Sequence, residues 1–483
     1  MNSSSRILKH TFVFGIANGI SKAINLILLP LYTNFMTISQ FGVFSLGLTL
    51  YYIANMMFRA GATSVMFKEY FEKKDVLYRK ILIGNTYIYL ILIAIALFFL
   101  SVLFKDFLNT SIIHAENSFV IILILLTAIS EALLSIPLSV LRAEEKSRLF
   151  GIFMVTQTLL TFILTYIALV VLEMNVVGAF AAMLIAKMVC FIAGTITIIS
   201  RIKLKMDLSI IKELAFLGWP LVFSGLATWI ITMSDKIIIS IFQGPARTGL
   251  YSLPERIGSI MTIAIFTPFS LLWGFESLKI YYNEDWQKKF PRYFVYLAGA
   301  SLAFASFLSL FAPELIVILG KAAYLDAVIV VPPILLALIF NIFTRFHTFY
   351  LTVRRKNYIA TLITLTGAVV NVLLNIILVK YFDYRAVAFS TLFAFCIIYY
   401  MTYIYVNKTM KFNHNVKKVS LLIFVFLINA VIGNFVKEIT LVNEFIKAAL
   451  VIISIVIIVK VSELYFIVKQ VKTFLHNLVQ KGE

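Results

Sequence analysis

The chain has 483 residues, of which 61% are hydrophobic and only 13% are charged. Soluble domains carry about 25% charged residues, so this composition excludes a soluble globular protein and indicates a polytopic membrane protein. The formal net charge of +19 does not indicate a nucleic-acid partner, because the basic residues are scattered between apolar segments and form no basic domain.

The chain divides into apolar segments bounded by charged or turn residues. The first begins at Thr11 and is predicted to be a retained helix, because no small-residue cleavage site follows it. A helix crosses the hydrocarbon core with about 17–25 residues, and every segment reaches this length. The prediction is an all-α fold with about fourteen transmembrane helices. In chain order, the segments cover residues 11–35, 42–66, 81–104, 117–141, 149–172, 174–200, 214–241, 248–278, 293–318, 325–351, 357–379, 385–406, 419–436 and 443–468.

The loops between these segments alternate between rich and poor in lysine and arginine. Basic loops such as residues 68–80 and 354–356 fall on one side of the predicted membrane, and poorer loops such as residues 105–116 fall on the other. Cytoplasmic loops carry the excess of Lys and Arg in membrane proteins. The alternation predicts a multi-pass protein of the cell membrane with both termini in the cytoplasm.

An internal repeat divides the chain. Phe41–Leu46 reads FGVFSL at the start of the second helix, and Thr248–Leu253 reads TGLYSL at the start of the eighth. Because an even number of helices separates the two copies, we expect parallel halves related by an axis along the membrane normal. The sequence predicts an N-lobe of six helices at residues 1–205, a C-lobe of six helices at 206–410, and two further helices with a cytoplasmic tail at 411–483.

Basic residues inside the predicted helices are the most informative polar feature. A cation at the bilayer centre costs roughly 2.5–3.5 kcal/mol on insertion scales, so a chain that keeps several is expected to use them. The first helix places Asn18, Lys22 and Asn25 on one face, and the second helix places Asn55 and Arg59 on one face. The embedded cations are Lys22, Arg59, Lys187, Lys236, Arg256 and Arg345.

Polar stripes of this kind face either neighbouring helices, through interhelical hydrogen bonds, or a water-filled cavity. The cavity is favoured for the stripes that contain Lys22, Arg59 and Arg256, whereas Lys187 could also pair within its lobe. Arg and Lys are natural partners of phosphate oxygens. An electropositive cavity therefore predicts a phosphorylated or otherwise anionic substrate and argues against a cationic drug.

Embedded acids are fewer than embedded cations. Asp235 adjoins Lys236 in the seventh helix, Glu255 adjoins Arg256 in the eighth, and Glu131 lies in the fourth. A structural cluster of salt bridges and a role in gating or ion coupling both remain open for these acids. The first two helices carry no acid, so the N-lobe cavity is expected to be electropositive on balance.

Six short motifs carry a resemblance to a known family. The chain resembles the polysaccharide-unit flippases of the multidrug/oligosaccharidyl-lipid/polysaccharide exporter (MOP) superfamily. The motifs cover about a third of the chain, in helices one, two, seven and eight. They are Gly15–Lys22 (GIANGISK), Leu28–Thr33 (LLPLYT), Phe41–Ser45 (FGVFS), Ser234–Lys236 (SDK), Thr248–Ser252 (TGLYS) and Trp273-Gly274.

The resemblance implies a two-lobed carrier for surface polysaccharide biosynthesis, whether of lipopolysaccharide, capsule or exopolysaccharide. Such carriers move a polyprenyl-diphosphate-linked oligosaccharide to the outer leaflet by alternating access. The resemblance assigns the diphosphate to Lys22, Arg59, Arg256 and Lys236. Asp235 departs from the family pattern, because relatives often carry a basic residue earlier in that segment. The implied partners are the lipid-linked oligosaccharide, membrane lipid, and a polysaccharide polymerase with glycosyltransferases.

Three other functions are alternatives to this one. A peptidoglycan-precursor flippase shares the fold and the charge. A drug/cation antiporter of the same fold needs an embedded carboxylate near the first helix, where this chain has Lys22. An enzyme is disfavoured because the longest external loop is short and no histidine cluster or nucleophile motif occurs. Cys190, Cys396 and His347 are interpreted as packing residues, and no metal or cofactor is expected.

Overall fold

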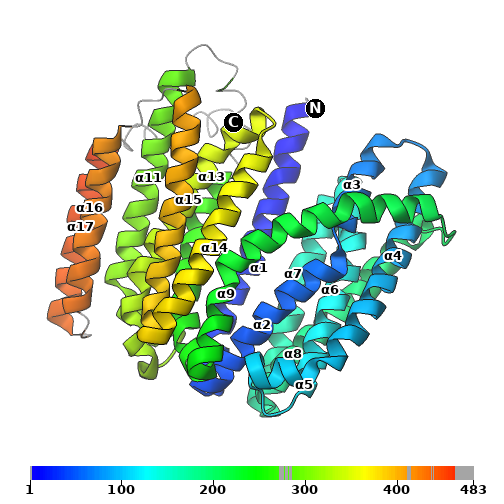
Figure 1. The fold of residues 1–483 in the computed structure, drawn as a ribbon, viewed down its shortest axis with the longest axis horizontal. Helices are drawn as coiled ribbons and strands as arrows, with labels where there is room; N and C mark the ends of the chain where they lie inside the picture. Colours follow the sequence, from blue (N-terminus) through cyan, green and yellow to red (C-terminus); the bar gives the residue numbers. More distant parts are fainter. Residues whose placement is uncertain are drawn as a thin grey trace, which may run out of the picture. The chain divides into compact units, whose positions relative to one another are not determined.

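The computed structural model describes residues 3–270 and 286–462, except 411–414, 437 and 439, together with residues 273, 277 and 281. Within this part the chain is built from helices and contains no strand (Figure 1), which confirms the predicted all-α class. Some predicted features fall outside the described residues. They are the ends of the predicted helices 248–278 and 443–468, Gly274, and the tail. The α-helices of the first half are α1 (Ser3–Phe35), α2 (Ile38–Arg59), α3 (Ala62–Glu72), α4 (Val76–Leu103), α5 (Lys105–Leu108), α6 (Phe119–Ala143), α7 (Ser147–Tyr166), α8 (Asn175–Ile198) and α9 (Leu208–Met261).

The second half continues the same pattern of long helices joined by short connections. Its α-helices are α11 (Trp286–Leu310), α12 (Ala312–Leu319), α13 (Val331–Val353), α14 (Asn357–Tyr381), α15 (Val387–Met410), α16 (Val416–Phe435) and α17 (Leu441–Ser462). Short π and 3-10 segments extend several of them, such as residues 167–171 after α7 and 322–330 before α13.

The number of long apolar helices agrees with the prediction. Twelve described segments are long and apolar enough to cross a membrane. The longest, Leu208–Ser270, is two helices, because Gly244 inside it has a non-helical backbone with φ 81° and ψ 175°. The 33-residue α1 is not among the twelve. With both included, the long helices correspond one to one with the predicted segments, as expected of a multi-pass membrane protein.

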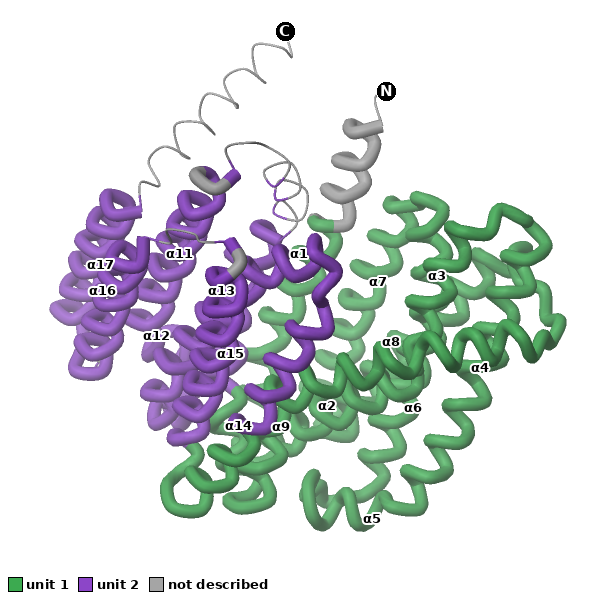
Figure 2. The backbone as a smooth tube through the Cα atoms, turned by 45° about the horizontal axis from the view of Figure 1, so that its top comes forward, with its two compact units in different colours: residues 1–252, 372–384 green, residues 253–371, 385–483 purple. Residues whose placement is uncertain are grey.

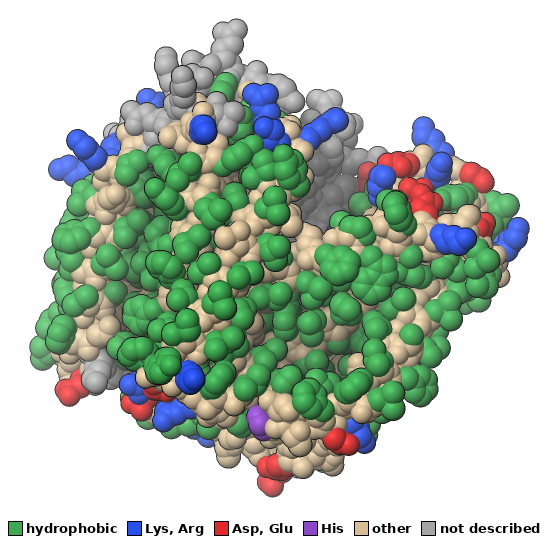
Figure 3. Space-filling model, in the orientation of Figure 1, with side chains coloured by type: hydrophobic (Ala, Val, Ile, Leu, Met, Phe, Trp, Pro, Cys, Tyr) green, Lys and Arg blue, Asp and Glu red, His purple; other side chains and the backbone are tan. Residues whose placement is uncertain are grey.

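The side chains on the outside of these helices fit a lipid environment. In Figure 3, apolar side chains cover the helices along their length, and lysine and arginine gather at the helix ends. Phe99, Ile196 and Leu362 are typical, with 64%, 62% and 58% of their surface exposed. Exposed apolar residues over most of a helix are characteristic of a membrane-spanning protein.

The helices form two compact units, coloured separately in Figure 2. Unit 1 comprises residues 1–252 and 372–384, and unit 2 comprises residues 253–371 and 385–483. The predicted lobes, with boundaries at 205 and 410, stay a prediction, because compact packing does not establish which helices move together.

The glycines of the internal repeat pack against each other in unit 1. A Cβ atom on Gly42 would lie 1.8 Å from the carbonyl oxygen of Pro245, and one on Gly249 would lie 2.2 Å from the carbonyl oxygen of Ile38. The start of α2 therefore meets the segment after the Gly244 bend of α9 backbone to backbone, and only glycine allows so close an approach. The repeated motif thus has a packing role.

We predict that Gly42→Ala lowers the stability of the purified protein, because the added methyl group must push two backbone segments apart. Overpacking of this kind costs about 1–3 kcal/mol or more. Thermal unfolding in detergent measures the change. Gly19→Ala is the matched control, since nothing lies within 4 Å of a Cβ at Gly19. Equal melting temperatures for the two variants would contradict this packing role.

In unit 2, the last two helices are tied to the rest by a buried ion cluster. Both α16 and α17 pack on α11. Lys447 of α17 is fully buried, pairs with Glu314 of α12, and donates to Glu444 at 3.1 Å. The other faces of these helices are apolar and exposed, as at Phe445 and Ile452. These faces are suited to contact with lipid.

Candidate functional site

Arg59 is the last residue of α2, and the chain breaks its helix directly after it. Ala60 and Gly61 both have left-handed backbones, with φ 44° and 69°, and α3 begins at Ala62. Gly61 accepts this conformation without penalty, whereas Ala60 does not. The prediction of one continuous helix over residues 42–66 was therefore wrong. The pattern of apolar residues continues through the break, so only the glycine marked it in the sequence.

The side-chain amide of Asn55 fixes α2 against α6. Asn55 of α2 donates a hydrogen bond to the carbonyl oxygen of Ala128 in α6 at 3.1 Å. Arg59 follows one helical turn later and is close enough to Glu131 for their charges to interact. Glu131 lies near the midpoint of the 25-residue α6, so this polar group sits at mid-depth in unit 1.

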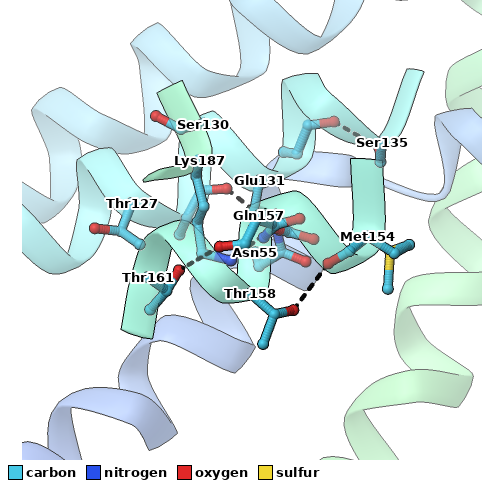
Figure 4. A network of polar contacts seen from close by, with 12 residues as sticks. Asn55, Thr127, Ser130, Glu131, Ser135, Met154, Gln157, Thr158, Thr161 and Lys187 are labelled. Atoms are coloured by element: carbon cyan, nitrogen blue, oxygen red, sulfur yellow. Dashed lines mark hydrogen bonds and ion pairs between the residues drawn. The ribbon is translucent and has the colours of Figure 1, made fainter. Parts of the chain in front are cut away.

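A polar network surrounds Glu131 (Figure 4). Lys187 of α8 donates to Glu131 Oε2 at 2.6 Å, and Gln157 of α7 donates to the same oxygen at 3.1 Å. The Lys187 ammonium group also lies 5.2 Å from the centre of the Tyr51 ring, within the range of a cation–π interaction. Lys187 is only 7% exposed. This cation is therefore neutralised inside its lobe, as the alternative interpretation predicted.

Arg59 keeps its charge without a carboxylate of its own. Among the described residues it forms no ion pair, and its Nε is buried without a hydrogen-bond partner. The group of Arg59, Lys187 and Glu131 contains two cations and one carboxylate, so one positive charge is left over. An uncompensated guanidinium at this depth is suited to bind an anion that enters from an aqueous space.

The stripe of the first helix also belongs to unit 1. Lys22 and Asn18 are partly buried, and Asn25 is exposed. The preceding residue, Ser21, donates to the carbonyl oxygen of Met154 at 3.3 Å, and α1 packs along α7. The contact with α7 therefore places Lys22 beside the helix that supplies Gln157 to the network.

Asp235 and Lys236 are buried in the first part of α9. They are only 5% and 4% exposed. The hydroxyl of Tyr251 donates to Asp235 at 2.8 Å, and the Lys236 ammonium group lies 3.8 Å from Met233 Sδ. The bond between Tyr251 and Asp235 connects the two sides of the Gly244 bend and favours the structural interpretation of Asp235. The roles of both residues toward substrate or coupling ion stay predictions.

Three further charged residues of the predicted helices belong to unit 2. Glu255 and Arg256 are partly buried in the last part of α9, and Arg256 forms no ion pair with any described residue. Arg345 of α13 is exposed, donates a hydrogen bond from its Nε to Asn341 Oδ1 at 3.2 Å, and has its guanidinium 5.2 Å from the centre of the Phe266 ring. Unit 2 therefore also carries guanidinium groups that have no carboxylate partner among the described residues.

Sequence reasoning found the members of the Glu131 network without their connections. Gln157 is one of several polar residues in the predicted helix 149–172, and Glu131 and Lys187 stood out as embedded charges. Tyr51 was missed, because a tyrosine among apolar residues gives no distinct signal. No pattern in the sequence could say that these residues from four helices meet.

Comparison with known proteins agrees with this fold. The family model described as "Polysaccharide biosynthesis protein" matches residues 7–273, which is more than half of the chain. No curated protein is detectably similar in sequence.

Several solved structures have the same fold. The lipid II flippase MurJ, in an inward closed conformation, aligns with a TM-score of 0.73 at 15% identity, covering 94% of this chain and 99% of that chain. An inward-facing multidrug resistance MATE transporter of the MOP superfamily aligns with a TM-score of 0.63 at 15% identity, covering 83% and 94%. A MOP superfamily transporter from Pyrococcus furiosus aligns with a TM-score of 0.58 at 15% identity, covering 84% and 95%.

Proposed function

The chain belongs to the polysaccharide biosynthesis protein family, and on that premise we propose that it flips a polyprenyl-diphosphate-linked oligosaccharide across the cytoplasmic membrane. It has the fold of a MOP superfamily transporter or flippase, a class of carriers rather than of enzymes. The observation that carries the substrate proposal is Arg59 of unit 1, which forms no ion pair with a described residue and whose Nε is buried without a hydrogen-bond partner.

The proposed mechanism is alternating access with a cationic binding site. Lys22 and Arg59 contact the diphosphate oxygens, while the polyprenyl chain stays in the lipid. Arginine suits this role because its planar guanidinium binds two phosphate oxygens at once and stays charged. A substrate shifts a conformational equilibrium only by binding one state better than the other. The head must therefore lose or gain contacts with these cations as the protein changes from inward-open to outward-open.

A second substrate has one observation in its favour. The lipid II flippase MurJ aligns over 99% of its own length, so a peptidoglycan precursor is the alternative head. A drug/cation antiporter is less well supported, because two embedded carboxylates of unit 1 are already engaged: Glu131 pairs with Lys187 at 2.6 Å, and Asp235 accepts a hydrogen bond from Tyr251.

Transport in reconstituted liposomes tests the proposed substrate. We expect the purified protein to move a polyprenyl-diphosphate oligosaccharide between leaflets, detected as loss of protection from an enzyme added outside that modifies the sugar. Lipid II and a fluorescent cationic drug serve as parallel substrates. Transport of lipid II alone would replace the proposed head by the peptidoglycan precursor, and transport of the drug alone would overturn an anionic substrate altogether.

The location and partners are part of the same proposal. A carrier of lipid-linked oligosaccharide works in the cytoplasmic membrane between glycosyltransferases, which build the head inside, and a polymerase, which uses it outside. The excess of Lys and Arg in alternate loops supports a cytoplasmic location for both termini. A fluorescent protein fused to the C-terminus should therefore be fluorescent in cells, whereas alkaline phosphatase at the same position should be inactive. The reverse result would contradict this orientation.

A further inference from the structure

A small cup opens at the end of unit 1 where α2, α6 and α8 begin. Its volume is about 120 Å³. It is lined by the first turns of α2 and α8, by residues 114–117 of the loop before α6, and by Val120 of α6. This end lies opposite the end of unit 1 that carries α3 (Figure 1). The basic loops that come after α6 and α8 in the chain lie at the α3 end. By the charge of the loops, the end with the cup is the external end.

The cup has an apolar floor and a polar rim. Val43, Val120 and Val176 form the floor and are 5%, 2% and 6% exposed. The rim is formed by exposed residues, among them Glu116 and Asn117. A flat ligand could therefore bury one apolar face on the valines while its edge meets polar groups.

The rim is held in place by its own hydrogen bonds. The side-chain amide of Asn109 donates to the carbonyl oxygen of Ala115 at 3.0 Å and accepts from the Ala115 N–H at 2.9 Å. His114 completes the turn with a left-handed backbone, φ 55°. On the facing side, Gln40 is fixed by the capping box of α2, in which its side-chain oxygen accepts from the Thr37 N–H at 3.0 Å. The cup is thus formed before a ligand arrives.

The rim keeps unused hydrogen-bonding groups. The side-chain oxygens of Gln40 and Asn117 are bonded to backbone N–H groups, which leaves both NH₂ groups as donors. The Glu116 carboxylate forms no ion pair or hydrogen bond with any described residue and supplies acceptors. The rim therefore offers both donors and acceptors around an apolar floor.

We propose that this cup binds a neutral sugar ring of the glycan on the outer side of the membrane. A pyranose has an apolar C–H face and an edge of hydroxyl groups that both donate and accept, which matches floor and rim. Glu116 disfavours a phosphate or an acidic lipid headgroup, since it is the one carboxylate of the lining and no lysine or arginine lines the cup. A metal ion is disfavoured because no described group of three His, Cys, Asp or Glu residues could hold one. The inference rests on the proposed function for its biological sense, and places a sugar contact apart from the diphosphate site.

Saturation-transfer NMR on the full-length protein in detergent micelles tests the cup directly. The probes are the methyl glycosides of glucose, galactose, N-acetylglucosamine and rhamnose at millimolar concentration. We expect transfer to the ring C–H protons of at least one glycoside. Glu116→Ala should weaken that binding about tenfold, as expected for loss of a hydrogen bond to a charged group. Val177→Trp, at the edge of the floor, should abolish it.

The matched control is Glu173→Ala, which removes an exposed acid just before α8 that does not line the cup. It should bind like the wild type. No transfer from the folded wild-type protein to any glycoside, or equal transfer in wild type and Glu116→Ala, would overturn the proposal. Glu116 is exposed, so its variant stays interpretable even if Val177→Trp fails to fold. Arg59→Ala should keep sugar binding, so a failure of the diphosphate mechanism and a failure of the cup give different results.

Discussion

Arg59→Ala is expected to abolish export of the glycan while the protein stays folded and inserted. The guanidinium is the uncompensated cation of the Glu131 network, and each charged hydrogen bond it gives to a phosphate is worth about 1.5–3 kcal/mol. Loss of a bidentate contact therefore lowers transport about a hundredfold or more at low substrate concentration. Complementation of a flippase-deficient strain, together with the liposome assay, measures the loss. Lys22→Ala is expected to have the same phenotype.

Two control variants separate binding from folding. Lys68→Ala removes a cation from α3, close in sequence, but Lys68 is exposed and faces Glu72 at 3.6 Å, so export should be unchanged. Arg59→Lys keeps the charge and loses the bidentate geometry, so we expect partial export. If both Arg59→Ala and Lys22→Ala complement fully, the proposed cationic binding site is wrong.

The helices of this protein could be predicted from sequence because each one depends on local properties. An apolar run of sufficient length must form a helix in lipid, where every backbone group needs a partner, and the loop charges predict the direction of each run. The break at Ala60 and Gly61 escaped prediction because it depends on tertiary contact. A Cβ on Gly61 would lie 2.2 Å from the carbonyl oxygen of Gly218, so α9 determines where α2 ends.

The sequence could predict the residues of the candidate site but not the contacts between them. Embedded charge identified Lys187 and Arg59 equally, since both carry the same cost of insertion. Packing distinguishes them: α6 presents Glu131 to Lys187 at 2.6 Å, while Arg59 remains without an ion pair among the described residues. Which cation is neutralised depends on how three helices meet, and this information is spread over long sequence separations.

Because Lys187 has an ion-pair partner and Arg59 has none in the described part of the chain, replacing Lys187 should affect stability first. Lys187→Met is expected to destabilise the protein by about 3–5 kcal/mol, because it leaves the Glu131 carboxylate in a buried site without its ion-pair partner. The loss should also impair export, since Glu131 then has only the Arg59 charge to compensate it and draws that guanidinium away from the substrate. Thermal unfolding in detergent and the liposome assay measure the two effects.

The double variant Lys187→Met/Glu131→Gln decides whether the pair is structural. It removes both charges and keeps an amide beside Gln157, so most of the lost stability should return, as is common when a whole buried pair is replaced. Arg59 keeps its charge in this variant, and export should recover with it. Lys68→Met is the control for an exposed pair and should change stability by less than about 1 kcal/mol. If the double variant were as unstable as Lys187→Met, the role of Lys187 would be packing; if it were stable but inactive, one of the two charges would act in transport itself.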